Sequence, residues 1–283
     1  MVQAAFIINP FSAGGKYQGF IKKLETLWEN PLIYISDSIQ GTARFIEETK
    51  QTVQVYVAVG GDGTISTVAR HLVHTDKVLA IFPAGSGNGF SNETNFTTDL
   101  KSLLSRIQEF KTHRMDTFTV NGRLSINVSG VGFDGSVVRR FERTERGYIN
   151  YIKVALKTFF VYRPVRIEFL DSKYSDCNGK YLMLNLANTR QFGNHAYIAP
   201  HASSTDGLVD VVLVKKFPTF YSALFTYRMF TRTLRQDKYV RYLSVSKIHF
   251  KVNSSKWHID GEYQSIKSPV EVEVQPKSLR VLS

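Results

Sequence analysis

The sequence predicts an α/β N-terminal domain with a mostly parallel sheet, followed by an all-β C-terminal antiparallel sandwich with helical insertions. In the first part, short β-branched runs alternate with segments of helical period, which is typical of a parallel sheet. After about Asp116, short strands separated by turn residues favour an antiparallel sandwich or barrel. We place the boundary at this change of period, with residues 1–120 in the first domain and 121–283 in the second. The last residues either end the second domain or return to the first.

Four strands and three helices are expected in the first domain. The strands are Ala4–Ile8, Leu32–Ile35, Val53–Val59 and Val78–Phe82, and the helices are Tyr17–Trp28, Thr42–Thr49 and Ile65–His74. In a parallel sheet, the loops that bind ligands follow the carboxyl ends of the strands. Glycine-rich loops follow Ile8, Val59 and Phe82, so we expect these three loops to meet at one edge of the sheet.

An expected hairpin spans the boundary between the two domains, and its Asn121-Gly122 pair suits a type I′ turn. Its strands are Thr117–Val120 and Arg123–Val128. Later strands are expected at Val165–Leu170, Tyr181–Ala187, Leu208–Val214, Val245–Lys251, Trp257–Ile259 and Val270–Val274. The helical insertions are Tyr148–Phe160 and Thr219–Arg235.

Composition indicates a globular protein, since 43% of the 283 residues are hydrophobic and 21% are charged. Cys177 is the only cysteine, which excludes an intrachain disulfide and fits a reducing compartment. No apolar run reaches the roughly 18 residues of a membrane span, and we expect no signal peptide. A cytoplasmic protein is therefore expected. The net charge of +12 suits an anionic partner, although a solvated basic surface explains it equally well.

The loop after Val59 carries the first candidate for chemistry. Gly60, Gly61 and Gly63 allow the backbone to approach a ligand closely, and a helix start places N–H groups toward an anion. Asp62 stands among these amides, where its carboxylate would repel a phosphate unless it held a metal or accepted a proton. The structural alternative is an aspartate that fixes its own turn through hydrogen bonds to the backbone.

Six segments carry a resemblance to a known family, and they follow one another along the chain in the order found in that family. They are Asn9–Gly15, Gly60–Thr64, Pro83–Phe90, Asn127–Asp134, Ala199-Pro200 with Asp206–Asp210, and Ile259–Glu262. The chain resembles the diacylglycerol kinase and sphingosine kinase catalytic-domain family, of the bacterial lipid kinase type, over nearly its whole length. The segment Gly60–Thr64 is shared with NAD kinases, whereas the others favour the lipid kinases.

The resemblance implies an NAD-kinase-like nucleotide fold that binds ATP in the first domain, and a lipid alcohol in the cleft between the domains. The γ-phosphoryl group of ATP would pass to the lipid hydroxyl, a reaction that needs a phosphate cradle, Mg²⁺ and a base. Lys16 or Arg44 would add charge, although each is as well explained as a solvated surface residue. The nucleotide-binding residues that the resemblance implies are Asn9, Pro10, Ser12, Gly14, Gly15, Lys16, Gly41, Thr42, Gly60, Gly61, Gly63, Thr64, Gly85, Ser86, Gly87 and Asn88.

Two acids are the catalytic candidates. Asp62 lies beside the expected phosphates, and Glu262 matches a glutamate that acts on the substrate hydroxyl in the family. The sequence leaves open which of them accepts the proton. Asp260 precedes Glu262 in an Asp-Gly pair that also serves as an ordinary hairpin turn.

The resemblance also implies a structural Mg²⁺ site. The matching aspartate is Asp206, with backbone carbonyls from Ser203 and Leu208, and Asp116 matches an aspartate of the same metal–water network. Oxygen ligands of this kind suit hard cations. The alternatives are a turn aspartate for Asp206 and a helix-ending aspartate for Asp116.

The chain departs from the family pattern at three places. Ser66-Thr67 stand where Asn-Glu is common, Gly89 where many bacterial diacylglycerol kinases have aspartate, and Asn194 where glycine is common. The form Gly85–Gly89 is closer to sphingosine-kinase-like members. These departures weaken the transfer of substrate identity from the family and leave Asp62 and Glu262 in place.

Two aromatic and basic stretches, Phe217–Arg235 and Tyr148–Arg163, suit contact with an anionic membrane. Packing of the same helices on the sandwich is the alternative. We expect a lipid alcohol substrate at a membrane surface, a cytoplasmic protein transiently at the inner membrane surface, and no nucleic acid partner. The sequence is compatible with a homodimer as well as with a monomer.

Two other functions share the nucleotide loops. A NAD kinase would use the same Asp62 loop but leaves Ile259–Glu262 unexplained, and a non-catalytic nucleotide or lipid sensor is favoured by Ser66-Thr67 and Gly89. No His, Cys and carboxylate spacing suggests zinc, and no serine hydrolase motif is present.

Overall fold

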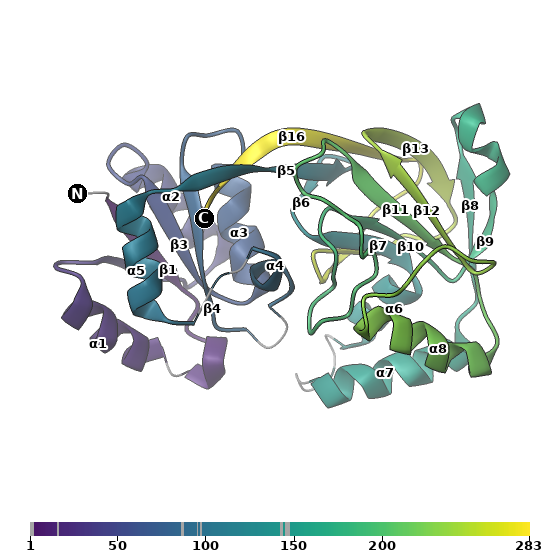
Figure 1. The fold of residues 1–283 in the computed structure, drawn as a ribbon, viewed down its shortest axis with the longest axis horizontal. Helices are drawn as coiled ribbons and strands as arrows, with labels where there is room; N and C mark the ends of the chain where they lie inside the picture. The colour runs from purple at the N-terminus through teal and green to yellow at the C-terminus, as the bar shows by residue number, and fades with distance from the viewer. Residues whose placement is uncertain are drawn as a thin grey trace. The chain divides into compact units, whose positions relative to one another are not determined.

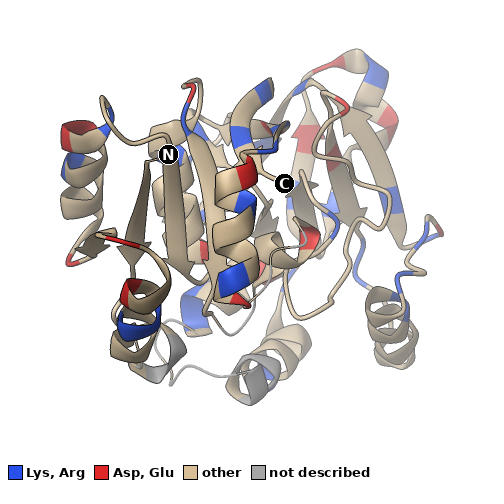
Figure 2. Cartoon of the chain, turned by 60° about the vertical axis from the view of Figure 1, so that its left-hand side comes forward, with Lys and Arg blue, Asp and Glu red and all other residues tan. Residues whose placement is uncertain are grey.

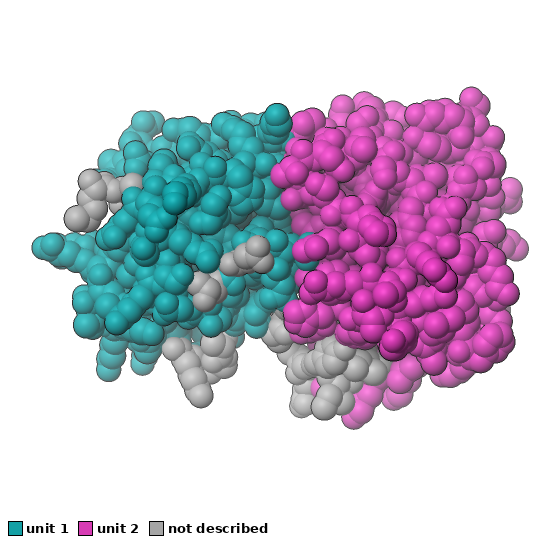
Figure 3. All heavy atoms as spheres, in the orientation of Figure 1, with its two compact units in different colours: residues 1–115, 277–283 teal, residues 116–276 magenta. Residues whose placement is uncertain are grey.

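The computed structural model describes residues 3–15, 17–85, 88–94, 96, 98–141, 144 and 148–283 (Figure 1). Two compact units divide the chain: unit 1 comprises Met1–Met115 with Lys277–Ser283, and unit 2 comprises Asp116–Pro276 (Figure 3). The chain passes from one unit to the other within strands β5 (Thr112–Val120) and β16 (Val270–Leu282). The last seven residues therefore belong with the N-terminal unit.

Unit 1 is an α/β domain around a parallel sheet. Its strands follow the order β2 (Leu32–Ile35), β1 (Ala4–Ile8), β3 (Val55–Gly60), β4 (Val78–Pro83) and the end of β16. In this register Val59 lies opposite Ile8 on one side and Phe82 on the other, so three strands end at one edge. Parallel strands of this kind are buried on both faces, which explains why all six residues of β3 are buried.

Helices cover both faces of this sheet. They are α1 (Tyr17–Leu27), α2 (Ile39–Thr49), α3 (Asp62–Leu72), α4 (Gly89–Glu93) and α5 (Leu100–Glu109), after a 3₁₀ turn η1 at Ser12–Gly15. Leu24 of α1 and Ile107 of α5 share a core with Val57. On the opposite face, the Tyr56 hydroxyl donates to the carbonyl of Ile46 in α2 at 3.1 Å. The alternation of side chains along β3 thus builds a core on each face.

Unit 2 is a sandwich of two sheets. One is antiparallel, in the order β12 (Val240–Val245), β11 (Val209–Val214), β10 (Met183–Ala187), β7 (Val128–Gly132), β14 (Lys256–Ile259) and β15 (Glu262–Ser265). The other contains β16, β13 (Lys247–Val252), β8 (Val165–Phe169) and β9 (Gly179–Tyr181), with β5 and β6 (Arg123–Ser125). Trp257, Phe250 and Phe118 lie in the core between them.

Three helices and a 3₁₀ turn are inserted in unit 2. They are α6 (Phe133–Phe141), α7 (Tyr148–Val161), α8 (Thr219–Phe230) and η2 (Ser172–Cys177). In the described part of the chain, no helix has the length and apolar character needed to cross a bilayer. Lysines, arginines and acids are scattered over the helices and strands of the described residues (Figure 2).

The fold class is confirmed, and several elements differ from the prediction. The single strand expected at Val245–Lys251 is wrong, because β12 ends at Val245 and β13 begins at Lys247. The helix expected to Arg235 ends at Phe230, where Arg232 adopts a φ of 60°. The hairpin strand expected to Val128 ends at Ser125, because the next amides bind a side chain. The single strand expected at Tyr181–Ala187 is also wrong, because β9 ends at Tyr181 and β10 begins at Met183 in the other sheet. Helices α4, α5 and α6 were not predicted.

Candidate functional site

The three glycine-rich loops meet in unit 1, as the parallel register requires. The Asn9 amide Nδ2 donates to Thr64 Oγ1 at 3.0 Å, which joins the first loop to the second. The N–H of Ala84 donates to the carbonyl of Gly60 at 2.8 Å, which joins the third loop to the second. The side-chain oxygen of Asn9 accepts the N–H of Phe11, so Asn9 also shapes its own loop. One edge of the sheet therefore presents all three loops together.

Gly61 and Gly85 bring two of these loops into backbone contact. A methyl group on Gly85 would lie 2.5 Å from the Cα of Gly61, and one on Gly61 would lie 3.1 Å from the Cα of Gly85. Both obstacles are backbone atoms, which cannot rotate away as a flexible side chain can. The N–H of Gly85 donates to Asn88 Oδ1 at 3.0 Å, which fixes the turn. Glycine is needed here for close approach.

Gly85→Ala is expected to lower the free energy of unfolding by about 1–3 kcal/mol, the usual cost of overpacking. The added methyl must push two backbones apart, because no side chain can yield. Urea denaturation followed by circular dichroism measures the change. Gly179→Ala is the control, because its methyl would meet the Tyr181 ring at an ordinary 3.6 Å. Equal stability of the two variants would contradict the close contact.

Asp62 anchors the third loop from the first residue of α3. Its Oδ2 accepts the N–H of Gly89 at 3.0 Å, and its Oδ1 accepts the N–H of Phe90 at 3.2 Å. These amides open helix α4 and would otherwise lack an intrahelical partner. The carboxylate thus bonds to residues 27 and 28 positions away, and it fixes more than its own turn.

A cavity of about 310 Å³ adjoins the loops within unit 1. Its walls are mainly apolar, and the Phe20 and Phe82 rings in them lie 4.8 Å apart between centroids. Asn9 and Ser12 supply polar atoms at the loop side. A flat aromatic group with a charged or polar extension fits this combination of walls and loops. The lining comprises Ile8, Asn9, Ser12, Tyr17, Gly19, Phe20, Lys23, Val59, Phe82, Ala84 and Leu100.

Gly63 is the second residue of α3, and the remaining residues of the expected nucleotide set fall into three groups. Pro10, Gly14 and Gly15 lie in or beside η1, in the same loop as Asn9. Gly41 and Thr42 lie in the first turn of α2, where their N–H groups donate to Ser38. Lys16, Ser86 and Gly87 lie outside the described residues.

Asp260 is a buried anchor in unit 2, with an exposed fraction of 6%. Its carboxylate accepts the Ser125 hydroxyl at 2.6 Å and the N–H groups of Ile126 and Asn127 at 3.1 and 3.0 Å. Asp260 and Gly261 have positive φ values of 49° and 85°, which close the β14–β15 hairpin. Glu262 is the first residue of β15 and therefore directly follows this fixed turn.

Asp260→Asn is expected to lower the free energy of unfolding by about 1–3 kcal/mol, since an amide NH₂ would face buried N–H donors. Urea denaturation followed by tryptophan fluorescence, in a Trp28→Phe background that leaves Trp257 as the only tryptophan, reports on the core of unit 2. Asp176→Asn is the matched control, because its bond to Arg241 is exposed and is worth about 0–1 kcal/mol. A loss at Asp260 no larger than at Asp176 would show that the buried bonds contribute little.

A buried polar cluster beside this turn was missed by the sequence reasoning. Asp134 Oδ2 lies 3.1 Å from His258 Nε2, and Asn185 Nδ2 donates to the same oxygen. The N–H of Gly261 donates to His258 Nδ1 at 3.3 Å, which assigns the ring proton to Nε2. His258 therefore connects Asp134 to the turn before Glu262. No signal in the sequence pointed to this cluster, because the collision that any side chain at Gly130 would make with Asp134 and Asn185 is visible only in the structure.

The expected metal residues are brought together in unit 2. The N–H of Asp116 donates to the carbonyl of Ser204 at 2.6 Å, and Asp116 Oδ2 accepts the N–H of Gly207 at 2.7 Å. Asp206 Oδ1 accepts the N–H of Leu208 at 3.0 Å. Within the described residues, no group of three His, Cys, Asp or Glu side chains clusters as metal ligands. The two carboxylates and neighbouring carbonyls are all hard oxygen donors, which fit Mg²⁺ rather than zinc.

Negative charge gathers around this loop. Burial raises the pKa of Asp210, a hydrogen bond from Ser244 opposes the rise, and the charge of Asp206 adds to it. Ser244 Oγ donates to Asp210 Oδ1 at 2.5 Å. A bound cation would relieve this repulsion between carboxylates.

Comparison with known proteins identifies the class that this fold and these loops define. Residues 3–120 match the family model of the diacylglycerol kinase catalytic domain. Residues 127–283 match the model of the YegS C-terminal NAD kinase beta sandwich-like domain. The chain belongs to this family of diacylglycerol kinases and YegS-like lipid kinases, and the resemblance found in the sequence is confirmed.

Individual relatives are distant. A diacylglycerol kinase of Mycobacterium tuberculosis is 24% identical over 243 residues, which cover 80% of this chain and 75% of that protein. An uncharacterized protein of Synechocystis sp. is 28% identical over 80% of this chain, and the match spans only 54% of that protein. A putative diacylglycerol kinase from Bacillus anthracis shares the fold, with a TM-score of 0.76, 19% identity, and coverage of 99% of this chain and 96% of that one.

Proposed function

We propose that this protein is an ATP-dependent lipid kinase that transfers the γ-phosphoryl group to the hydroxyl of diacylglycerol or a related lipid alcohol, such as a sphingoid base. The observation that carries the proposal is the meeting of three glycine-rich loops in unit 1. Membership of the lipid kinase family supports it. In this proposal the protein works from the cytoplasm and contacts the inner membrane surface transiently, where its lipid substrate lies.

The adenine of ATP occupies the apolar cavity of unit 1 in this proposal. The Phe20 and Phe82 rings suit a flat base, and Asn9 and Ser12 supply polar atoms where the cavity adjoins the glycine-rich loops. The phosphates then lie along the backbone amides of the glycine-rich loops, which can approach because Gly61 and Gly85 carry no side chain.

Asp62 acts as a positioning residue for the phosphate loops. Its two oxygens each accept an N–H group at the start of α4, so it sets the distance between the second and third loops. Glu262 is the better candidate for the base that accepts the proton of the lipid hydroxyl. Asp260 and His258 fix the turn from which Glu262 projects. In this proposal Glu262, rather than Asp62, is therefore the general base.

Mg²⁺ would neutralise the negative charge of the phosphates during transfer. A second, structural Mg²⁺ would be held by Asp206 and the carbonyls of Ser203 and Leu208, with Asp116 in its hydrogen-bonding network. The hydrogen bonds that tie Asp116 to this loop support the assignment. The cation would hold the loop against β11 and would take no part in proton transfer.

A substrate panel tests the proposed function. The protein is mixed with γ-labelled ATP, Mg²⁺ and either diacylglycerol, a sphingoid base, a monoacylglycerol or NAD, and the products are identified by mass. We expect label in at least one lipid. Label in NAD alone would support a NAD kinase, and ATP binding without any transfer would support the non-catalytic alternative.

A further inference from the structure

A buried histidine lies on the strand that leads into the turn before Glu262. His258 belongs to β14, and its exposed fraction is 3%. Its neighbour Trp257 faces the core between the two sheets, so the alternation of the strand turns His258 to the opposite face, toward α6. A buried imidazole is stable only if both ring nitrogens have hydrogen-bond partners.

Two glycines make room for these partners. Gly135 of α6 packs against the backbone of β14, where a methyl group on it would collide with a carbonyl oxygen of the strand. A methyl group on Gly130 of β7 would collide with the side chains of Asp134 and Asn185. Helix α6 and strand β7 can therefore approach closely enough for Asp134 to reach the ring of His258.

Asp134 holds the ring of His258 in one tautomer. Its Oδ2 lies 3.1 Å from His258 Nε2 and also accepts Asn185 Nδ2, while its Oδ1 accepts the N–H of Gly135 at 2.8 Å. A carboxylate only accepts hydrogen bonds, so the ring proton belongs on Nε2. Nδ1 is then an acceptor, and the N–H of Gly261 donates to it at 3.3 Å. The uncharged ring therefore suits both of its neighbours.

The bond from Gly261 acts on the turn that carries the proposed base. Asp260 and Gly261 both have positive φ values in this turn, and Glu262 follows directly as the first residue of β15. A movement of the turn would displace the Glu262 carboxylate. Misplacement of a reacting group by about 1 Å can cost about 10²-fold in rate.

Among the described residues, Asp134 is the one carboxylate that pairs with His258. Strands β7 and β10 pack beside the ring and contain no ionisable residue. The loop after β10 adds the Phe192 ring, whose centroid lies 6.2 Å from that of His258. The other ionisable residues on the elements packed against β14, and on β14 itself, are Arg123 of β6, Arg139 and Arg140 of α6, Lys256 of β14, and Glu262 and Tyr263 of β15.

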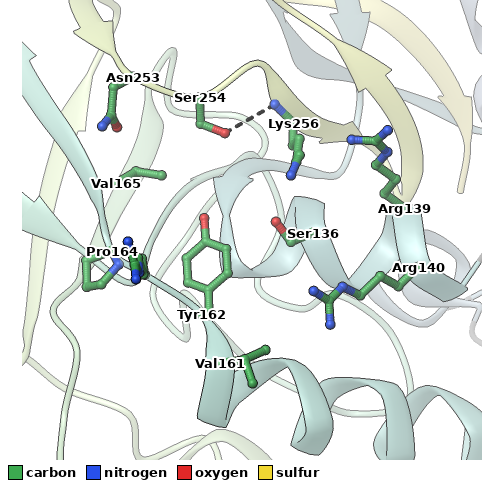
Figure 4. Close-up of a pocket in the computed structure, with 11 residues that line it drawn as sticks. Ser136, Arg139, Arg140, Val161, Tyr162, Pro164, Val165, Asn253, Ser254 and Lys256 are labelled. Atoms are coloured by element: carbon green, nitrogen blue, oxygen red, sulfur yellow. Dashed lines mark hydrogen bonds between the residues drawn. The ribbon is translucent and has the colours of Figure 1, made fainter.

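A cavity of about 530 Å³ lies beside this cluster but is not lined by Asp134 or His258. Figure 4 shows the hydroxyls of Tyr162 and Ser136 inside it. Burial raises the pKa of Tyr162 to about 12, a hydrogen bond with Ser136 opposes the rise, and the charge of Asp134 adds to it. Tyr162 therefore keeps its proton at neutral pH, whereas histidine is the side chain that ordinarily changes charge between about pH 5 and pH 8.

We propose that His258 is a positioning residue for Glu262 that works only as the uncharged ring, and that its protonation lowers phosphoryl transfer at acid pH. This role rests on the proposed function, in which Glu262 is the general base. A proton added to the ring goes to Nδ1, because Nε2 already carries one. Nδ1 then becomes a donor that faces the N–H donor of Gly261, and the turn loses this bond.

Two substitutions separate the two ring nitrogens. His258→Asn places an oxygen near the position of Nδ1, where it can still accept the N–H of Gly261. His258→Gln reaches the position of Nε2 and can still donate to Asp134, but it leaves Gly261 without an acceptor. We expect kcat of the Asn variant to exceed that of the Gln variant by about tenfold or more, with the same dissociation constant for ATP in both. Equal kcat values would overturn the positioning role.

The pH profile of kcat tests the protonation of His258. Wild-type kcat should fall by about tenfold or more between about pH 8 and pH 5, where histidine side chains change charge. His258→Asn should lose this part of the profile, because asparagine does not titrate. An acid limb with the same midpoint in both proteins would belong to another group, such as Glu262, and the proposed effect of pH on His258 would be wrong.

His249→Gln is the matched control, because His249 lies on β13 of the same unit and its bond with Glu271 is partly exposed. It should keep kcat within about twofold of wild type, as is usual for surface changes. Thermal melting establishes that the variants are folded. A wild-type protein that phosphorylates no lipid would refute the proposed function, whereas an active one with equal His258 variants would refute the role of His258 alone.

Hydrogen exchange supplies a measurement that needs no turnover. In the peptide of residues 256–266, His258→Gln should exchange faster than His258→Asn, because only the former leaves the Gly261 amide without its acceptor. If the Gln variant does not fold, the wild-type protein carries the test. After correction for the intrinsic rate, this peptide should be less protected at about pH 5 than at about pH 8, and unchanged protection would contradict the proposal.

Discussion

Asp62→Asn is expected to reduce phosphoryl transfer by about 10²–10³-fold, with weaker ATP binding, because misplaced catalytic groups carry costs of this size. Asparagine offers one acceptor where Gly89 and Phe90 both donate, and its NH₂ group would face a backbone N–H. The third loop would then lose one of its two anchors to α3. Steady-state kinetics over a range of ATP concentrations, with calorimetric titration of ATP, measures both effects.

Asp76→Asn is the control for this substitution. Asp76 belongs to the same unit, its side chain is highly exposed, and its ion pair with Lys77 is long at 3.7 Å. The control should keep wild-type kinetics. If Asp62→Asn transferred phosphate at the wild-type rate, the positioning role would be refuted, and the hydrogen bonds to α4 would be structural only.

Glu262→Gln is expected to lower kcat by about 10²–10⁴-fold while ATP binding stays unchanged, which is the range for loss of a general base. Glutamine keeps the size of the side chain but cannot accept a proton. Since the glycine-rich loops that we propose bind ATP belong to unit 1 and Glu262 to unit 2, the substitution should separate chemistry from ATP affinity. The measurements are kcat with a saturating lipid and the dissociation constant for ATP.

Glu168→Gln serves as the control, because this exposed glutamate lies on β8 of the same unit, opposite Lys251. It should leave kcat within about twofold of wild type, as is usual for surface changes. A small effect at Glu262, together with a large effect at Asp62, would transfer the role of base to Asp62.

The strands of unit 1 could be predicted because their pattern is local. Runs such as Val55–Gly60 are β-branched and end on glycine, and parallel pairing then places their loops at one edge. Helix α5 could also have been predicted from the sequence, since Asp99 caps it. Its apolar residues follow the helical period, at Leu100, Leu103, Leu104 and Ile107.

The break between strands β12 and β13 could not be predicted from the alternation of residue types along the sequence. Val240 to Val252 contains no glycine or proline, and only Ser246 separates a strand of one sheet from a strand of the other. A chain that changes sheets at a single residue keeps the alternation of a continuous strand. The pattern therefore predicted one element where two exist.

The hydrogen bonds between distant parts of the chain in the candidate site could not be predicted from the sequence either. An Asp-Gly pair predicts a hairpin turn, and the turn is present, but Asp260 also binds Ser125 and Asn127, more than 130 positions earlier. His258 and Asp134 are 124 positions apart. Sequence spacing carries no information about such pairs, so the anchors of Glu262 became visible only in the fold.

Hydrogen exchange with and without ATP tests the central claim most directly, because it locates the nucleotide on the chain. The account predicts slower exchange on ATP binding in three peptides, which contain residues 9–15, 60–64 and 84–90. Strands β11 and β12 of unit 2 should exchange at an unchanged rate. Protection confined to other segments, or none at saturating ATP, would contradict the assignment of these loops as the ATP site.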